Sequence, residues 1–124
     1  MKYIILLFTT LIIFVGCSKN NDEITDPISP TEPEKVYIYS AVSSPTTSES
    51  VTIKNNSGTS QDLTGWIIGD INDPTAYKIP NGTNLIQGAK KTYYRSTLGF
   101  QINDTGEIIY LKNSSGNTVD TWSN

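Results

Sequence analysis

The chain has 124 residues, of which 36% are hydrophobic and 17% charged, and its formal net charge at pH 7 is −3. This length suits one small domain with extensions and is too short for two full domains. With one cysteine and no histidine, the chain lacks the residues for Cys/His zinc sites, Cys–His nucleophiles and Ser-His-Asp triads. The acidic balance provides no basic surface for a phosphate backbone, so we expect no nucleic-acid partner. The composition therefore favours a binding or structural role.

An apolar run follows Lys2 and extends from Tyr3 to Val15. It is shorter than the roughly 20 residues that a membrane-spanning helix needs, and a charged start before such a run is typical of a secretory signal. The run ends in Phe14-Val15-Gly16-Cys17, which resembles the bacterial lipobox. In lipobox proteins, signal peptidase II cleaves before the cysteine, whose thiol carries diacylglycerol. The resemblance implies a signal peptide over residues 1–16 and a palmitate-type lipid anchor on Cys17, in the bacterial cell envelope and most simply at the outer membrane.

Two other interpretations of Cys17 stay open: a buried thiol in a hydrophobic helix, and an uncleaved signal anchor that tethers the chain. If the lipobox interpretation holds, two or three acyl chains hold the protein stably on a bilayer. The thiol is then used, so the exported domain has no disulfide and depends on its apolar core. The sequence implies no cofactor and no metal beyond this covalent lipid.

Residues 17–35 form the lipidated cysteine and a flexible, acidic and Pro-rich tether. Three Xaa-Pro pairs, Asp26-Pro27, Ser29-Pro30 and Glu32-Pro33, stand among polar residues with only two aliphatic side chains. Such a composition favours an extended spacer of up to about 3.1 Å per residue. The predicted domain is residues 36–124.

Apolar residues of this domain alternate with polar ones, as in Val51 and Ile53, and turn-forming clusters of Asn, Asp, Gly and Pro separate the alternating segments. A period of two predicts β-strands, and no segment has a sustained helical stripe. The predicted strands are residues 36–42, 50–55, 65–70, 77–79, 91–96, 107–112 and 118–122. About seven short strands indicate an all-β, immunoglobulin-like antiparallel β-sandwich.

Five segments carry a resemblance that spans most of residues 38–121: Glu49-Ser50-Val51-Thr52-Ile53-Lys54-Asn55, Asp62-Leu63-Thr64-Gly65-Trp66-Ile67-Ile68-Gly69-Asp70, Tyr77-Lys78-Ile79-Pro80, Leu85-Ile86-Gln87-Gly88, and residues 106–120. They resemble the lamin tail domain, an immunoglobulin-like module of nuclear lamins and of many bacterial exported proteins. The Leu-x-Gly-Trp element, with Leu63, Gly65 and Trp66, is the most specific part. We expect Gly65 to adopt a backbone conformation that other residues resist, so that Leu63 and Trp66 both turn into the core.

If Trp66, Ile68, Ile109, Leu111 and Val119 point inward, alternation places four apolar side chains on the outer face of the same strands. They are Ile67, Ile108, Tyr110 and Trp122. An apolar patch that faces water often marks an interface, so we expect this patch to contact a protein or glycan partner. The alternative is that the tether or residues 36–42 cover it.

Two further segments have a functional and a structural interpretation. Alternation in Lys90–Arg95 would place Lys91, Tyr93 and Arg95 on one face, as in binders of nucleic acid or anionic glycans. Lysines that protect an edge strand are the favoured explanation. Asp70-Ile71-Asn72-Asp73 contains oxygen ligands with the spacing of part of a calcium loop. Asp and Asn are also ordinary turn residues, so we expect no metal there.

The acids Asp62, Asp104, Glu107 and Asp120 are expected beside turns or at outward positions, where nothing raises the pKa of a carboxyl group. We therefore expect no enzyme. The sequence predicts a membrane-anchored, extracytoplasmic binding or adhesion module that recognises a protein or glycan partner. A structural or accessory subunit of an envelope complex is the alternative, and a minimal enzyme is the third hypothesis. The ligand and the oligomeric state stay open.

Overall fold

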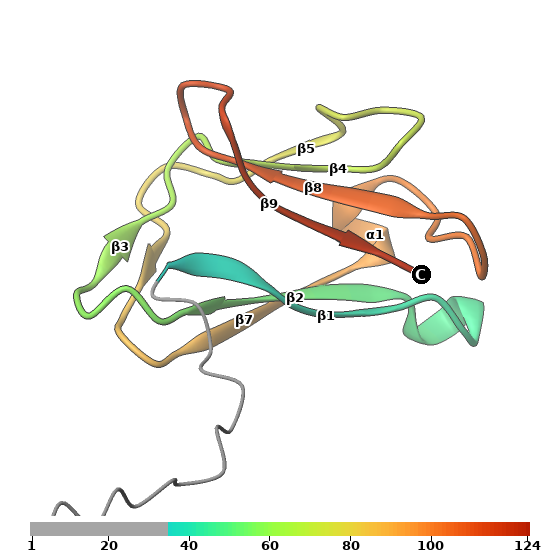
Figure 1. The fold of residues 1–124 in the computed structure, drawn as a ribbon, viewed down its shortest axis with the longest axis horizontal. Helices are drawn as coiled ribbons and strands as arrows, with labels where there is room; N and C mark the ends of the chain where they lie inside the picture. The colour runs from blue at the N-terminus through green and yellow to red at the C-terminus, as the bar shows by residue number, and fades with distance from the viewer. Residues whose placement is uncertain (1–34) are drawn as a thin grey trace, which may run out of the picture.

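Short strands make up nearly all of the regular structure in residues 35–124, the part of the chain that this computed structural model describes (Figure 1). Two helical turns, η1 (Thr46–Ser48) and α1 (Arg95–Leu98), interrupt the strands. The predicted signal peptide, the lipidation site Cys17 and nearly all of the predicted tether lie outside the described residues. The strands are β1 (Val36–Val42), β2 (Ser50–Asn55), β3 (Gln61–Asp62), β4 (Ile67–Gly69), β5 (Tyr77–Lys78), β6 (Asn84–Leu85), β7 (Lys90–Tyr94), β8 (Ile108–Lys112) and β9 (Thr118–Ser123).

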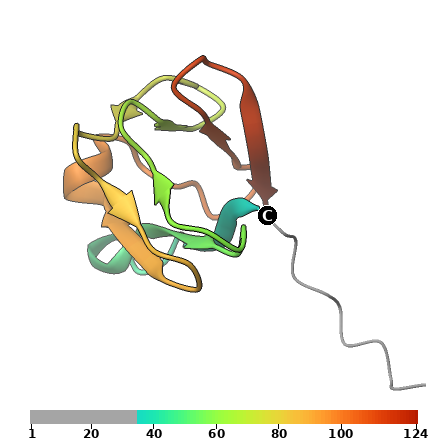
Figure 2. The same cartoon turned by 90° about the vertical axis from the view of Figure 1, so that its left-hand side faces the viewer.

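The strands form two main antiparallel sheets, with the orders β1-β2-β7 and β5-β4-β8-β9, and a small β3-β6 ribbon. Figure 1 shows the two sheets as two layers, with β3 at one end and η1 and α1 toward the other. Figure 2 views the β3 end, where the segment that carries β3 rises from the first sheet toward the second. The architecture confirms the predicted immunoglobulin-like antiparallel β-sandwich.

The core lies between the sheets and follows the period of two that the sequence shows. Val51 and Ile53 of one sheet are fully buried, as are Ile68, Ile109 and Leu111 of the other. Because alternate residues of a strand face opposite sides of a sheet, each strand contributes every second side chain to this layer. The apolar core carries the stability of a domain whose described residues contain no cysteine.

The predicted bounds hold for β1 and β2 and fail where the chain bends. Residues 91–96 were expected as one extended strand, but β7 ends at Tyr94 and α1 begins at Arg95. The short helix buries Leu98, which is 1% exposed, and ends at Gly99, whose φ of 80° suits a left-handed C-cap. The chain therefore turns away from the sheet at Arg95.

Gly65 has φ of 74° and donates its N–H to the carbonyl of Ile79 at 3.0 Å. The N–H of Trp66 bonds the carbonyl of Leu63, also at 3.0 Å, so residues 63–66 form a tight turn before β4. This confirms that Gly65 adopts the left-handed conformation that glycine tolerates best. Leu63 is fully buried as expected, whereas Trp66 is only partly buried and packs against the rim of the core.

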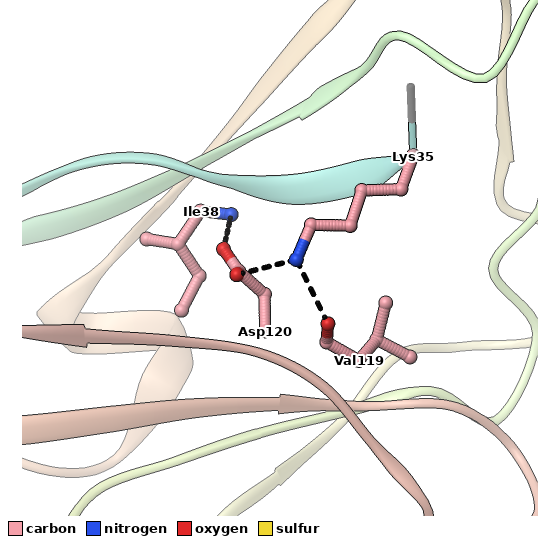
Figure 3. Close-up of polar contacts among 4 residues, drawn as sticks. All are labelled: Lys35, Ile38, Val119 and Asp120. Atoms are coloured by element: carbon pink, nitrogen blue, oxygen red, sulfur yellow. Dashed lines mark hydrogen bonds and ion pairs between the residues drawn. The ribbon is translucent and has the colours of Figure 1, made fainter. Parts of the chain in front are cut away.

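One side chain closes the sandwich between the edge strands β1 and β9 (Figure 3). The carboxylate of Asp120 accepts from Lys35 Nζ at 2.8 Å and from the N–H of Ile38 at 2.8 Å, and Lys35 Nζ also donates to the carbonyl of Val119 at 3.1 Å. The sequence placed Asp120 among outward or turn positions, which is wrong. Asp120 lies opposite the buried Leu111 in the β8-β9 ladder and reaches across to the other sheet.

Candidate functional site

The predicted patch of Ile67, Ile108, Tyr110 and Trp122 does not form one outward surface. The first three lie half-buried on the outer side of β4 and β8. Trp122 lies opposite the fully buried Ile109 and packs partly buried against the core, so its predicted outward orientation is wrong. The β8-β9 ladder shifts register next to Leu111. Asp120 and Trp122 pair with the buried Leu111 and Ile109, so alternation places Val119 on the opposite side, and it is not among the side chains packed on the core.

The turn that follows β4 covers part of the same outer face. A Cβ atom added to Gly69, which pairs with Tyr110, would lie 2.3 Å from the backbone carbon of Pro74 and 2.5 Å from the carbonyl oxygen of Asp73. The turn is held by Asp70, which is 4% exposed and accepts from the N–H groups of Asn72 and Asp73. These oxygens therefore organise a turn, and residues 35–124 contain no group of three or more acidic, His or Cys side chains that could hold a metal ion.

The candidate acids Glu107 and Asp62 also accept hydrogen bonds from backbone N–H groups. Glu107 lies beside the turn at residues 103–106, as predicted, but it is fully buried and not outward; it accepts from the N–H and Nδ2 of Asn103 and from the N–H of Ile108, at 2.8–3.0 Å. The hydroxyl and the N–H of Thr64 hold the pKa of the exposed Asp62 below its usual value. A general acid needs a raised pKa, so hydrogen bonds that favour the charged form oppose that role for Asp62.

The structure contains a pocket that the sequence did not predict, at the end of the sandwich formed by η1, α1 and the chain after α1. Its volume is about 520 Å³, within the roughly 300–1,000 Å³ of clefts that bind small molecules. It is lined by Thr46, Thr47, Glu49, Tyr94, Arg95, Ser96, Gly99, Phe100 and Gln101.

The bend at Arg95 builds the pocket. The N–H of Arg95 bonds the carbonyl of Glu49 at 2.9 Å, and the N–H of Gly99 bonds the carbonyl of Arg95 at 2.9 Å, which fixes α1 beside the start of β2. As a result, only part of the predicted face forms: Lys91 and Tyr93 lie on the same side of β7, with Lys91 Nζ 5.7 Å from the centroid of the Tyr93 ring, but Arg95 leaves it. Lys91 is exposed, Tyr93 is buried at 4% exposure, and Arg95 belongs to the pocket.

An ion pair of unequal burial lies in the pocket wall. Glu49 is 1% exposed, and its Oε2 accepts from the N–H of Ile102 at 3.1 Å. Its Oε1 accepts no hydrogen bond within the described part of the chain and lies 3.6 Å from Nη1 of Arg95. The Arg95 side chain is 39% exposed and makes a long contact of 3.4 Å to Oε1 of Gln101. Within residues 35–124 the guanidinium, which carries five N–H donors, therefore makes only this long hydrogen bond and the ion pair to Glu49.

The pocket also has an aromatic side. Tyr94 is 57% exposed, and Phe100 is partly buried against the core. Tyrosine combines an apolar ring with a polar tip, which suits it to contacts at a wet surface. The lining therefore combines two aromatic rings, hydroxyl and amide groups, and one pair of opposite charges.

A sequence model described as the Lamin Tail Domain matches residues 29–124. The chain belongs to the lamin tail domain family. The match covers every strand of the sandwich and begins within the residues predicted as tether. No curated protein sequence matches the chain. The match confirms the resemblance carried by Leu63, Gly65 and Trp66.

In this lamin tail domain, the sequence gave little sign of the pocket. Glu49 stood out only as part of a family motif, and Arg95 as part of the predicted strand 91–96 and of the alternating Lys90–Arg95 segment. Thr46, Phe100 and Gln101 belong to segments with no periodic pattern. A clearer signal was Gly99 four residues after Arg95, since glycine often follows the last turn of a helix.

Proposed function

We propose that this protein is a lipid-anchored, extracytoplasmic binding module that recognises a protein or glycan partner without catalysing a reaction. The observation that carries the proposal is the position of the pocket. β1 leads away from Lys35, where the predicted tether joins the domain, and η1 follows at the far end of this strand (Figure 1). At about 3.3 Å per residue, the strand separates the two ends by roughly 20 Å.

The lamin tail domain family supports a binding or structural role. Its immunoglobulin-like fold suits modules whose function lies in their surfaces and loops. The carboxylates of Glu107, Asp62 and Asp120 all accept hydrogen bonds from the domain itself. A pocket that combines Tyr94, Arg95 and Gln101 suits recognition better than acid–base chemistry.

Membrane anchoring rests on the lipobox-like Phe14-Val15-Gly16-Cys17, as the sequence predicts. Within residues 35–124 no helix is long and apolar enough to cross a bilayer. An extended tether of up to about 3.1 Å per residue would hold the domain several nanometres from the lipid surface. The pocket would then face away from the outer membrane of a bacterial envelope.

The anchor is tested by Cys17→Ser in the full chain, expressed in a bacterium and followed by membrane fractionation. We expect the variant to leave the membrane fraction, because no thiol remains to carry diacylglycerol. Ser18→Ala is the matched control and should stay membrane-bound. If the Cys17→Ser protein still needs detergent for its release, an uncleaved signal anchor explains the attachment and the lipid proposal is wrong.

Binding is tested with the full-length protein in proteoliposomes, by its retention on intact bacterial cells. We expect reversible retention that a double variant, Tyr94→Ala with Gln101→Ala, weakens. A matched double variant at exposed positions away from the pocket lining, Tyr39→Ala with Ile86→Ala, should be retained like the wild type. Equal retention of the two double variants would contradict recognition through the pocket.

The alternative is a structural or accessory subunit of an envelope complex. It is favoured by the apolar strip of Ile67, Ile108 and Tyr110, which the turn after β4 covers only in part. Such a subunit would co-purify from native membranes in a fixed ratio with a companion protein. A Tyr110→Arg variant would abolish that co-purification and leave retention through the pocket unchanged.

A further inference from the structure

We infer that the pocket beside Glu49 and Arg95 binds the terminal ring of a neutral glycan. This inference rests on the proposed binding function and specifies its ligand class. Three features of the lining carry it: the exposed aromatic ring, the arrangement of hydrogen-bonding groups and the balance of charge.

The aromatic feature is Tyr94, which ends β7 and exposes 57% of its surface at the rim of the pocket. The less polar face of a pyranose ring is lined by C–H groups, and it packs on the flat face of an aromatic ring. Phe100, partly buried on the lining, adds apolar surface beneath the same space. A tyrosine that stays this exposed next to a hollow is a suitable platform for a sugar ring.

The hydrogen-bonding feature is the mixture of donors and acceptors that line the pocket together with Tyr94. Arg95 supplies only donors, and its side-chain contacts within residues 35–124, 3.6 Å to Glu49 and 3.4 Å to Gln101, are both long. Gln101, Thr46 and Thr47 supply groups that donate and accept. A sugar hydroxyl also donates and accepts, so neighbouring hydroxyls can satisfy an arginine and an amide together.

The charge feature distinguishes a neutral ligand from an ionic one. Among the described residues, Glu49 and Arg95 are the only charged side chains on the lining, and they balance each other. A ligand carboxylate placed on the guanidinium would lie close to the buried Glu49 carboxylate, and a ligand ammonium would meet Arg95. Both cases put like charges near each other in a partly desolvated site, which disfavours acidic sugars and charged peptide ends.

Glu49 acts here as a positioning residue. Its Oε2 is fixed by the N–H of Ile102, and its Oε1 faces Nη1 of Arg95. The carboxylate therefore holds the guanidinium against the pocket wall without occupying all of its donors. A bound sugar would contact the exposed part of Arg95, while Glu49 stays buried.

The test uses the full-length protein in a zwitterionic detergent, since a detergent with a sugar headgroup would compete for the site. The probe is an array of neutral oligosaccharides that end in glucose, galactose, mannose or N-acetylglucosamine, beside matched sialylated and uronic-acid forms. We expect binding to one or more neutral termini and weaker binding to their acidic forms. The methyl glycoside of the best terminal sugar should compete.

Variants assign the binding to the pocket. Tyr94→Ala and Arg95→Ala should each weaken binding by about tenfold or more, which corresponds to about 1.4 kcal/mol. Tyr39→Ala is the matched control, because Tyr39 is an exposed tyrosine (44%) that does not line the pocket, and its affinity should stay within about twofold. If Arg95→Ala melts at a lower temperature, Gln101→Ala replaces it, because this exposed side chain has no role in the core.

Three results would overturn the glycan inference: no array binding, preference for acidic glycans, or neutral binding that Tyr94→Ala leaves unchanged. None of these by itself removes the proposed binding function. If retention on cells still depends on Tyr94 and Gln101 after a negative array, the module binds a protein partner. If the wild-type protein is not retained on cells either, both the glycan inference and the proposed binding function are wrong.

Discussion

The outer faces of the two sheets differ in what covers them. On the β5-β4-β8-β9 sheet, the turn after β4 lies against Gly69, and Tyr110 is half-buried. On the β1-β2-β7 sheet, Tyr39 and Tyr94 stay exposed, at 44% and 57%. Lys90 lies over the ring of Tyr39, with Nζ 3.4 Å from its centroid, and Tyr94 lines the pocket.

Alternation therefore assigns a residue to a side of a sheet but does not say what packs on that side. A single turn near in sequence covers the face that looked more apolar. The sheet that contains the predicted lysine-protected edge strand, β1-β2-β7, exposes the rings of Tyr39 and Tyr94 on its outer face.

Replacing Trp122 by alanine removes a side chain that the four-stranded sheet packs against the core. Because Trp122 packs partly buried on the core opposite Ile109, we expect a loss of about 3 kcal/mol in the free energy of unfolding. Tyr110→Ala, on the outer face of the same sheet, should cost about 1 kcal/mol. Urea unfolding of both variants checks the contrast. Equal losses would mean that Trp122 faces outward after all.

Replacing Gly69 by alanine tests the cover on the outer face. The new Cβ would overlap the backbone of Asp73 and Pro74, so the turn must move and stability should fall by about 2 kcal/mol. Gly82→Ala is the control: its Cβ has open space but its φ is 77°, which costs about 1 kcal/mol from backbone strain alone. Thermal unfolding compares the two. A smaller loss at Gly69 than at Gly82 would show that the turn does not press on β4.

Replacing Asp120 by alanine opens the side of the sandwich where the two sheets meet. The change removes the acceptor for the Ile38 N–H and the partner of Lys35, and we expect a loss of about 1 to 2 kcal/mol. Lys35→Met removes only the lysine contacts. Its effect should stay below about 1 kcal/mol, because the Lys35 side chain is 39% exposed. A larger loss for Lys35→Met than for Asp120→Ala would contradict this assignment.

The smallest effect is expected at Tyr93, beneath the exposed face of the three-stranded sheet. Its buried hydroxyl has no hydrogen-bond partner in residues 35–124, so Tyr93→Phe should leave stability unchanged or raise it by up to about 1 kcal/mol at neutral pH. Tyr94→Phe is the exposed control. A clear loss for Tyr93→Phe would reveal a polar partner of the hydroxyl.

The same substitution has a pH signature. Burial, and secondarily the neighbouring Tyr77, raise the pKa of Tyr93 above its ordinary value of 10.0. The unfolded chain therefore releases this proton at a lower pH than the folded chain does. The free energy of unfolding is thus unaffected by this group below pH 10 and declines as the pH rises above it. Tyr93→Phe should flatten that decline in urea unfolding between pH 9 and pH 11, two values chosen to lie about one unit on either side of the unfolded pKa.

The sequence predicted the fold class and much of the core because these depend on local, repeated signals. The period of two in β2 and β8 requires one face of each strand to be buried, and Gly65 satisfies a turn that few other residues tolerate. It was less reliable for the facing of β9. Asp120 and Trp122 face inward because they pair with the buried Leu111 and Ile109, and alternation counted along a single strand does not say which of its two sides meets the core.

By itself, the sequence determined an antiparallel β-sandwich, since hydrophobic alternation and turn residues act over a few neighbours, and its resemblance around Leu63, Gly65 and Trp66 indicated the lamin tail domain family. Only the tertiary structure decided that Glu49, Arg95 and Phe100 surround one hollow, that the turn after β4 covers an apolar face, and that Asp120 joins the two sheets. These features depend on contacts between segments far apart in the chain. Such contacts leave no period in the sequence, because each partner meets the other only after the sheets have packed.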